Sequence, residues 1–356
     1  MNKNFSITLK ELGEKLGLEL VGDGSKVING VCAPYDANPD SLCVIWDTKN
    51  TRLDEAVPVL GRSDFFDDAN RSGLVSADPR LVLPALLSLF TRIVEHRSGV
   101  HPSAVVSPLA AVSPDAWVGP MCVLESGAVI GALARLDAGV YVGQDVFVGE
   151  KTVIESQAVL MPGTRVGKDC LLHAHCVIGC DGFGFIPTAS PDSPSGRKII
   201  KIPQIGNTVI EDNVEIGAFT AIDRGAIGDT IIGSGTKIAN HVQIGHSVKI
   251  GRDCIICSMS GVGGSSVVED GVTISVQAGV NDHVRIGKGA LLGGRTGAAN
   301  DVEPGAVVSG FPARPHNEAR KALVLAARLP DIYERVKNLE RITKARGGAK
   351  NERSQS

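Results

Sequence analysis

Aromatic residues are scarce in this 356-residue chain, where Phe, Tyr and Trp make up 4% of positions and Trp occurs only twice. A strong charge of either sign is also missing, because 36 Lys and Arg stand against 39 Asp and Glu, for a formal net charge of −3. The chain therefore lacks the basic field that nonspecific nucleic-acid binding needs, and we expect no nucleic-acid partner.

Long apolar runs are absent as well. No stretch reaches the roughly 18 consecutive apolar residues of a membrane-spanning helix, so we expect no stable membrane insertion. The N-terminal sequence MNKNFSITLKELGEKLG has no apolar centre like that of a secretory signal, and we place the protein in the cytoplasm.

Glycine is abundant by contrast, with 42 residues, and a branched aliphatic residue recurs every six positions from Val100 to Ile178. The frame is lost between Phe185 and Gln204. It returns from Ile210 to Ile222, jumps by ten, and continues from Ile232 to Leu292. Such a fixed period is the signature of a repeat architecture.

The hexad itself indicates a short strand followed by a tight turn. Its first position is aliphatic and points inward, and its fifth is small, so we expect that side chain inside too. Its second is often Gly, which we assign to a backbone site with positive φ. Three hexads, about 18 residues, then form one triangular coil of a parallel β-helix whose coils lie about 4.8 Å apart.

The segments on either side lack the hexad. Residues 1–99 open with a capping box at Thr8 to Glu11 and read as a small α/β domain. Residues 100–312 form the β-helix, with a loop insertion at 185–204. Residues 313–346 are predicted to be C-terminal helices divided at Pro330, and 347–356 a disordered tail.

The eight cysteines raise the question of a metal site. Cys254 and Cys257 have a zinc-like spacing, but Cys122, Cys170, Cys176 and Cys254 all occupy the small fifth position of their hexads. We interpret them as small buried apolar residues and predict no metal site.

Two histidines and a glycine can be placed by the same frame. His246 is third in the hexad of Ile244, and the hexads that carry Gly264 and His283 follow one and two full coils later. These three residues should lie along one face within about 10 Å. His241 belongs to the preceding face, and the interruption at 185–204 leaves His175 unplaced.

A neutral imidazole in such a column can accept a proton from an amine or a hydroxyl that attacks an acyl carbonyl. A glycine N–H can donate to the oxyanion that forms. Because a flat prism wall has no pocket of its own, we expect a neighbouring subunit to complete the site.

Several motifs make the chain similar to one family. DGFGF (Asp181 to Phe185), VEIGAFTAIDRGAIGDTIIG (Val214 to Gly233), NHVQIGHSVKIG (Asn240 to Gly251), NDHVRIG (Asn281 to Gly287) and EPGAVVSGFPARP (Glu303 to Pro315) resemble the UDP-3-O-acylglucosamine N-acyltransferases of lipid A biosynthesis. The resemblance implies a mainly β protein: a left-handed parallel β-helix between a nucleotide-binding α/β domain and C-terminal α-helices, assembled as a homotrimer.

The resemblance also implies an activity. These enzymes transfer a 3-hydroxyacyl chain from the phosphopantetheine thioester of acyl carrier protein to the 2-amine of a UDP-linked, 3-O-acylated glucosamine, without a further cofactor. It gives His246 the role of general base, Gly264 that of oxyanion donor and His283 a supporting role.

Binding residues follow from the same resemblance. Asn240, Gln243, Asp181 and Phe183 become substrate-binding candidates. The segment LCVIWDTKN departs from the family, since Val44 and Asn50 stand where aromatic residues stack on uracil, and Trp46 is the aromatic residue left nearby. For the acidic carrier protein, basic residues are available at Arg197 and Lys198, and in the stretch 313–321.

Other functions stay open at this stage. One is acylation of a different nucleotide-linked sugar, which the altered N-terminal segment permits. Another is a zinc carbonic anhydrase of the same helix type, in which His241 and His246 would be ligands. A third is a scaffold without catalysis, for which replacing His246 changes nothing.

Overall fold

The computed structural model describes residues 6–46, 53–66, 71–91, 97–310 and 315–352, with side chains to residue 343 in the C-terminal segment. The chain divides into two compact units, Met1–His96 and Arg97–Ser356. Each unit is described by itself.

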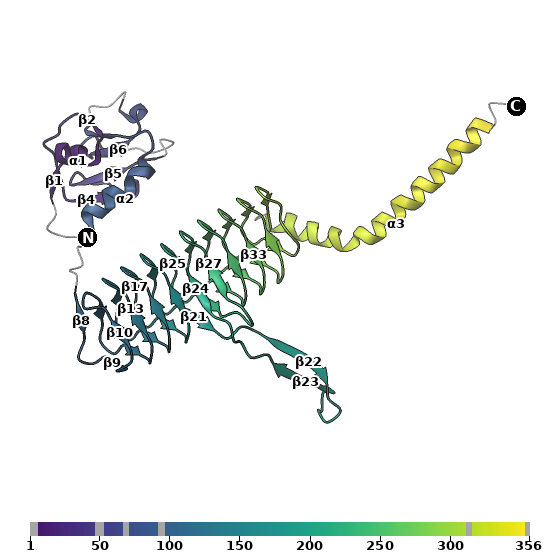
Figure 1. The fold of residues 1–356 in the computed structure, drawn as a ribbon. Coiled ribbons are helices and arrows are strands. Elements are labelled where there is room, and N and C mark those ends of the chain that lie inside the picture. The colour runs from purple at the N-terminus through teal and green to yellow at the C-terminus, as the bar shows by residue number, and fades with distance from the viewer. Residues whose placement is uncertain (1–5, 47–52, 67–70, 92–96, 311–314, 353–356) are drawn as a thin grey trace. The chain divides into compact units, whose positions relative to one another are not determined.

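The first unit is a small α/β domain, as predicted (Figure 1). Its five-stranded sheet has the order β2-β7-β6-β5-β4, in which only the β2–β7 pair is antiparallel. β1 and β3 pair separately. The elements are β1 (Ile7–Thr8), α1 (Leu9–Leu16), β2 (Glu19–Val21), β3 (Val27–Ile28), β4 (Gly30–Cys32), a 3₁₀ turn (Pro34–Asp36), β5 (Ser41–Val44), β6 (Val59–Gly61), a second 3₁₀ turn (Ser63–Phe65), β7 (Gly73–Val75) and α2 (Pro79–Phe90).

The predicted capping box opens α1. The Thr8 hydroxyl accepts a hydrogen bond from the Glu11 N–H, and the Glu11 carboxylate accepts one from the Thr8 N–H. Strand β5 divides the core in two, because Leu42 and Val44 pack in one apolar cluster and Cys43 and Ile45 in another.

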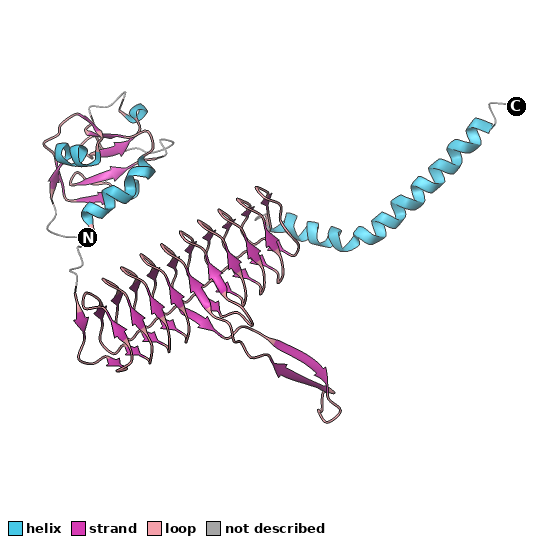
Figure 2. Cartoon of the chain, viewed as in Figure 1, coloured by secondary structure: helices cyan, strands magenta, loops and turns pink. Residues whose placement is uncertain are grey.

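The second unit is a left-handed parallel β-helix of three sheets, which confirms the predicted fold (Figure 2). Every hexad contributes a short strand, and each strand pairs in register with the strand one coil later. We name the sheets after their first strands. Within the described residues, the β8 sheet contains β8 (Gly99–Val100), β11 (Trp117–Val118), β14 (Arg135–Leu136), β17 (Val153–Ile154), β20 (Leu171–Leu172), β25 (Glu215–Ile216), β28 (Lys237–Ile238), β31 (Ile255–Ile256), β34 (Thr273–Ile274), β37 (Leu291–Leu292) and β39 (Val307–Val308).

The other two walls of the prism are built in the same way. The β9 sheet contains β9 (Val105–Val106), β12 (Val123–Leu124), β15 (Tyr141–Val142), β18 (Val159–Leu160), β21 (Val177–Cys180), β26 (Ala221–Asp223), β29 (Gln243–Ile244), β32 (Gly261–Val262), β35 (Gly279–Val280) and β38 (Gly297–Ala298). The β10 sheet contains β10 (Ala111–Val112), β13 (Val129–Ile130), β16 (Phe147–Val148), β19 (Arg165–Val166), β24 (Thr208–Ile210), β27 (Thr230–Ile232), β30 (Lys249–Ile250), β33 (Val267–Val268) and β36 (Arg285–Ile286).

The interior of the prism confirms the expected roles of positions one and five. The aliphatic first residues form one continuous buried cluster. Where position five is Thr or Ser, its hydroxyl donates to a backbone carbonyl of the next coil, as Thr152 does to Gly167 at 2.7 Å and Ser266 to Asn281 at 2.7 Å. Polar residues are therefore tolerated inside because each one closes a hydrogen bond.

The role predicted for the second-position glycines was wrong for most of them, although Gly179, second in the hexad of Ile178, has a φ of 89°. Gly119 does not have a positive φ, and a Cβ built on it would lie 2.7 Å from the Leu136 carbonyl oxygen of the next coil. Glycine is needed there because two backbones approach closely. Positive φ falls instead on the fourth position, and often on residues with side chains, such as Met121 (φ 58°), Phe219 (58°) and His241 (59°).

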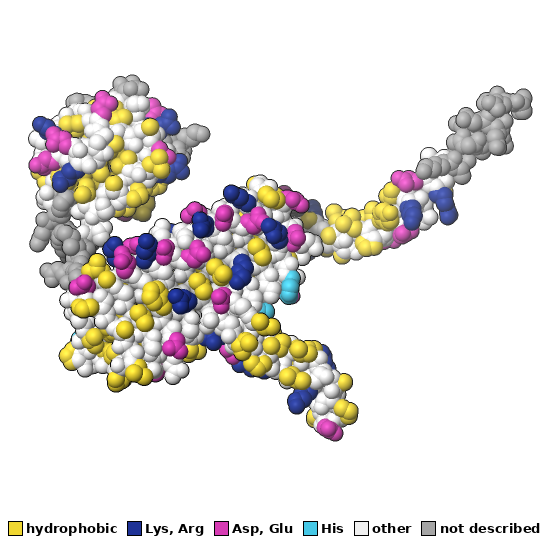
Figure 3. Space-filling view, in the orientation of Figure 1, with side chains coloured by type: hydrophobic (Ala, Val, Ile, Leu, Met, Phe, Trp, Pro, Cys, Tyr) yellow, Lys and Arg dark blue, Asp and Glu magenta, His cyan; other side chains and the backbone are white. Residues whose placement is uncertain are grey.

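The insertion at 185–204 contains a β-hairpin where the sequence predicted a loop. Strands β22 (Phe185–Ala189) and β23 (Arg197–Lys201) pair antiparallel and leave the stack between β21 and β24 (Figure 1). Apolar side chains cover much of the hairpin, with Ile186 53% and Ile199 69% exposed (Figure 3).

The C-terminal segment is one helix, α3 (His316–Glu352), which corrects the predicted division at Pro330. Pro330 removes a single intrahelical hydrogen bond, and strong helix formers on both sides allow the helix to continue through it. No helix of the described residues is long and apolar enough to cross a membrane.

Candidate active site

One corner of the prism, directly after the strands of the β9 sheet, carries the predicted column of residues. Strands β29, β32 and β35 pair in register on three consecutive coils. The Ser265 N–H donates to the His246 carbonyl at 2.8 Å, and the His283 N–H donates to the Gly264 carbonyl at 3.0 Å. His246, Gly264 and His283 thus follow one another along a single corner, as the register predicted.

The imidazole of His246 lies between two glycines. A Cβ built on Gly264 would lie 2.7 Å from His246 Nε2, and one built on Gly182 would lie 2.5 Å from the His246 Cβ. The Nδ1 atom is buried and finds no hydrogen-bond partner among the described residues. Nε2 is therefore the ring nitrogen that a ligand can reach.

Asp223 is a site residue that the sequence analysis missed. Its side chain is 8% exposed, and its carboxylate accepts hydrogen bonds from Gln243 Nε2 at 3.0 Å and Cys180 Sγ at 3.3 Å. Burial raises the pKa of this carboxyl above its ordinary value, and the hydrogen bonds and the nearby His246 ring offset part of that increase. The available signal was an aspartate at position two of its hexad, where glycine is frequent.

A hollow of about 740 Å³ lies in front of this corner. Among the residues that line it are five candidates predicted from sequence: Asp181, Phe183, Gln243, His246 and Gly264. Asp223 lines it as well. Five predicted residues, distant in sequence, therefore share one cavity.

The base of the hairpin forms the opposite wall of the hollow. Phe183 and Phe185 pack edge to face with ring centroids 5.0 Å apart, and the Phe183 side chain is 85% exposed. Lys201 Nζ pairs with the Asp181 carboxylate at 2.5 Å, which ties the second hairpin strand to the coil before it. The wall offers both apolar surface and a charged pair.

Two predicted residues lie outside this lining. His283 is exposed, and its Nδ1 lies 3.3 Å from the carboxylate of Asp282, which itself lines the hollow. Asn240 follows a strand of the β8 sheet and so lies at a different corner, where its Oδ1 accepts the Ala218 N–H at 2.8 Å. The structure brings His283 next to the hollow and does not bring Asn240 there.

Trp46 belongs to the first unit, where it follows β5 and is 50% exposed. Val44, at a position where the family has an aromatic residue, is buried in the core. Asn50 lies outside the described residues. Trp46 thus has a free aromatic surface, and Val44 has none.

His241 lies at the corner that follows the β8 sheet. Its ring stacks on Phe219 with centroids 5.2 Å apart, and Phe219 stacks on His175 at 4.8 Å. His241 and His246 therefore point from different corners, and Phe219 separates His241 from His175. Among the described residues, no three His, Cys, Asp or Glu side chains are grouped to hold a metal ion.

The cysteines at position five are buried, as the hexad predicted. Cys122, Cys176 and Cys254 have no exposed surface and Cys170 is 2% exposed. Burial raises the pKa of the Cys176 thiol to about 12, so it stays protonated at neutral pH.

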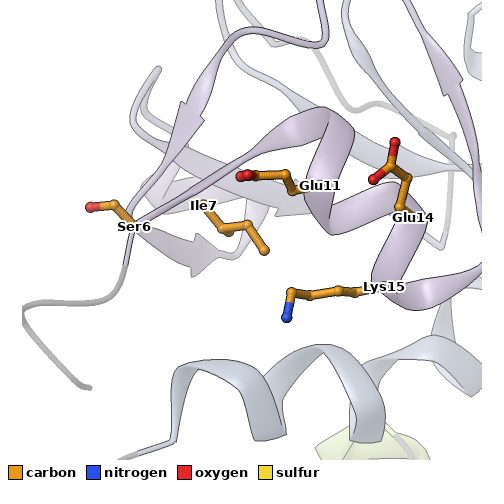
Figure 4. A pocket seen from close by; sticks show the side chains of 5 residues that line it. All are labelled: Ser6, Ile7, Glu11, Glu14 and Lys15. Carbon is orange, nitrogen blue, oxygen red and sulfur yellow. The ribbon is translucent and has the colours of Figure 1, made fainter.

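A second hollow, of about 450 Å³, lies beside α1 in the first unit (Figure 4). Ser6, Ile7, Glu11, Glu14 and Lys15 line it. The Glu11 carboxylate is already hydrogen bonded within the capping box, so it is not free to bind a ligand in this hollow.

Comparisons with known proteins identify relatives of this chain. The bacterial transferase hexapeptide (six repeats) family matches residues 229–264, which include His246 and Gly264. A UDP-3-O-acylglucosamine N-acyltransferase of Coxiella burnetii (strain Dugway 5J108-111) is 32% identical over 346 residues, covering 96% of this chain and 99% of the relative.

Other relatives match over a shorter region. The enzyme of that name from Methylobacterium sp. (strain 4-46) is 46% identical over 164 residues, which cover 46% of this chain and 45% of the relative, so this match spans less than half of its length. Among solved structures, an Arabidopsis UDP-N-acetylglucosamine acyltransferase is similar at 26% identity and a TM-score of 0.49, over 59% of this chain and 71% of that one.

Proposed function

The chain belongs to the UDP-3-O-acylglucosamine N-acyltransferase family, and we propose that it transfers a 3-hydroxyacyl group from acyl carrier protein to the 2-amine of UDP-3-O-acylglucosamine. The observation that carries the proposal is the setting of His246: one imidazole nitrogen buried, the other facing a hollow, and a buried carboxylate close by.

His246 acts as the general base. Its Nε2 accepts the proton of the 2-amine as the nitrogen attacks the thioester carbonyl, and a positioned imidazole contributes about 10² to 10⁴ in rate. The ring gains positive charge in this step, and the carboxylate of Asp223 stabilises that charge in a site of low polarity. Gln243 holds Asp223 in place through its 3.0 Å hydrogen bond.

Gly264 supports the oxyanion. Its N–H donates to no carbonyl among the described residues, and the residue borders the hollow beside Nε2. An amide in that position can bind the carbonyl oxygen as it becomes negative. The tetrahedral intermediate then expels the phosphopantetheine thiolate, which takes the proton from the His246 imidazolium, and the acyl group remains on the amine without a covalent enzyme intermediate.

Each of the two units offers further surfaces to the substrates. Trp46 offers a half-exposed ring for a nucleobase, and Phe183 and Phe185 offer apolar surface to the acyl chains. Arg197 and Lys198 lie on exposed strand β23 and suit an acidic carrier protein. The hollow is open on one side, which a neighbouring subunit of a homotrimer would close.

The test is acyl transfer from a 3-hydroxyacyl carrier protein to UDP-3-O-acylglucosamine, comparing the wild type with His246→Ala. We expect kcat/KM to fall at least about a hundredfold. His241→Ala is the matched control, because it removes a histidine five residues away at another corner, and it should keep its activity within about twofold.

A wild type that is inactive on this acceptor but acylates another nucleotide sugar, such as UDP-N-acetylglucosamine, would show that the acceptor has changed. Equal activity of wild type and His246→Ala would remove the assigned base.

A further inference from the structure

Two cysteines of the first unit are direct partners across neighbouring parallel strands. Cys32 ends β4, Cys43 lies within β5, and the two residues are paired in register. Neighbouring strands lie about 4.8 Å apart, a spacing inside the 4.4–6.8 Å range of Cα separations found in disulfides. The backbone therefore places both residues at a distance that a disulfide can bridge.

Both thiols also point to the same side of the sheet. Cys32 packs against the apolar cluster that contains Cys43, Ile45, Val57 and Val59, whereas Leu42 and Val44 face the opposite cluster. The Cys32 thiol donates to the carbonyl of Ser41 at 4.0 Å, at the start of the strand that carries Cys43. Burial first, and then the neighbouring Cys32, raises the pKa of the Cys43 thiol to about 12.

The two thiols differ in access. Cys43 has no exposed surface, whereas Cys32 is partly exposed. A small oxidant can therefore reach Cys32 from solvent, while Cys43 is protected behind it.

A buried cation lies next to this pair. Arg71 is 8% exposed, and its Nη2 donates to the Leu53 carbonyl at 3.0 Å. Its Nε and Nη1 atoms are buried and have no hydrogen-bond partner among the described residues. The guanidinium is close enough to Cys43 to favour the charged form of its sulfur. The guanidinium also lies over the Phe65 ring, 4.9 Å from its centroid, and its two free N–H-bearing atoms can donate to an anion such as a thiolate.

We propose that Cys32 and Cys43 form a dithiol that a hydroperoxide closes to a reversible intrachain disulfide, with Arg71 as a positioning residue. The Cys32 thiolate attacks the peroxide, its sulfur takes one oxygen to become a sulfenic acid, and an alcohol or water leaves. The Cys43 thiol then displaces that oxygen as water, which forms the S–S bond. Across both steps two thiols lose two electrons and two protons, and the peroxide accepts them.

Other cysteines of the chain lack this arrangement. Cys122, Cys170, Cys176 and Cys254 are buried singly within the prism, and Cys180 contacts Asp223. Cys257 is partly exposed and serves as a matched control.

The experiment uses the full, reduced chain treated with hydrogen peroxide, followed by alkylation and peptide mapping by mass spectrometry. We expect two thiols to become resistant to alkylation, a cross-linked peptide that joins Cys32 to Cys43, and complete recovery with dithiothreitol. Cys257→Ser should give the same cross-link, and Cys32→Ser should abolish it and leave Cys43 unoxidised.

Arg71→Met should slow the second step, attack of Cys43 on the sulfenic acid, about tenfold, because it removes the charge that favours the thiolate form of Cys43. An unchanged rate would exclude Arg71 from the mechanism. The proposal fails if peroxide oxidises Cys32 to a sulfinic acid with Cys43 still free, if Cys32 pairs between chains, or if both thiols remain alkylatable. The wild-type peptide map decides this even if a variant does not fold, and the readout is independent of acyl transfer.

Discussion

Two corners of the β-helix each carry a column of rings, and the rings have different surroundings. After the β9 sheet, His246 is at position three of its hexad, enclosed by Gly182 and Gly264 with one nitrogen buried. After the β8 sheet, Phe219 and His241 are at position four, have left-handed backbone, and stack face to face in solvent. His246 thus differs from His241 in its corner, its enclosure and its backbone conformation, whereas His283, at position four of the active corner, shares the left-handed backbone with a φ of 58°.

Filling the space beside His246 should have the largest effect. Gly264→Ala places a Cβ 2.7 Å from Nε2, so the imidazole must move, and we expect kcat/KM to fall about a hundredfold without loss of folding. Gly279→Ala is the control, because a Cβ there meets open space on the same sheet. Steady-state kinetics and thermal melting of both variants test this. Equal losses would indicate a general effect of alanine on the coils.

Asp223→Asn should reduce kcat about tenfold, because the imidazolium loses its balancing charge while the side-chain shape is kept. The pH profile adds a second readout. Burial raises the pKa of Asp223, so in the wild type part of the activity lost on acidification comes from protonation of this carboxyl. The variant should lack that contribution. A variant with the wild-type rate and profile would leave Asp223 with a purely structural role.

A substitution at the corner after the β8 sheet should change the stability of the protein and not its activity. Phe219→Ala removes two stacked ring contacts, and we expect the free energy of unfolding to fall by about 1 kcal/mol or somewhat more. Acyl transfer should stay within about twofold of the wild type. Chemical denaturation measures the first quantity, and a large loss of activity in a folded Phe219→Ala variant would contradict the division between the corners.

The smallest effect is expected at His173, on the wall of the β8 sheet. Burial lowers its pKa, but hydrogen bonds to Glu215 and Glu155, at 3.0 and 3.1 Å, outweigh burial and raise it overall. The bonds therefore stabilise the fold below the unfolded-state pKa, near 6.5, and this contribution is lost as pH rises through the higher folded-state pKa.

We accordingly expect His173→Gln to lower the free energy of unfolding by at most about 1 kcal/mol at pH 6, since the groups remain partly exposed. The difference should shrink towards pH 9. Denaturation curves at the two pH values measure this difference in the free energy of unfolding. A difference that grows with pH would contradict a raised pKa for His173.

The sequence predicted the prism, its interior and the column of His246, Gly264 and His283, because a strict period converts position in the chain into position in space. It missed Asp223, whose approach to His246 depends on the jump of ten residues between Ile222 and Ile232, where the period does not hold. It also misassigned the second-position glycines. A close contact between the backbones of two successive coils cannot be recognised from the sequence of either coil alone.

Contact between two successive backbones has a further consequence. Where a glycine lets two successive coils come into backbone contact, the distance between groups along a corner is fixed by the separation of the coils and not by local loops. A whole coil of 18 residues could be added between Gly119 and Ile154 without changing the distance from His246 to Gly264, because the repeat is uniform there. Coils can thus be gained or lost away from the site while the distances between the reacting groups stay the same.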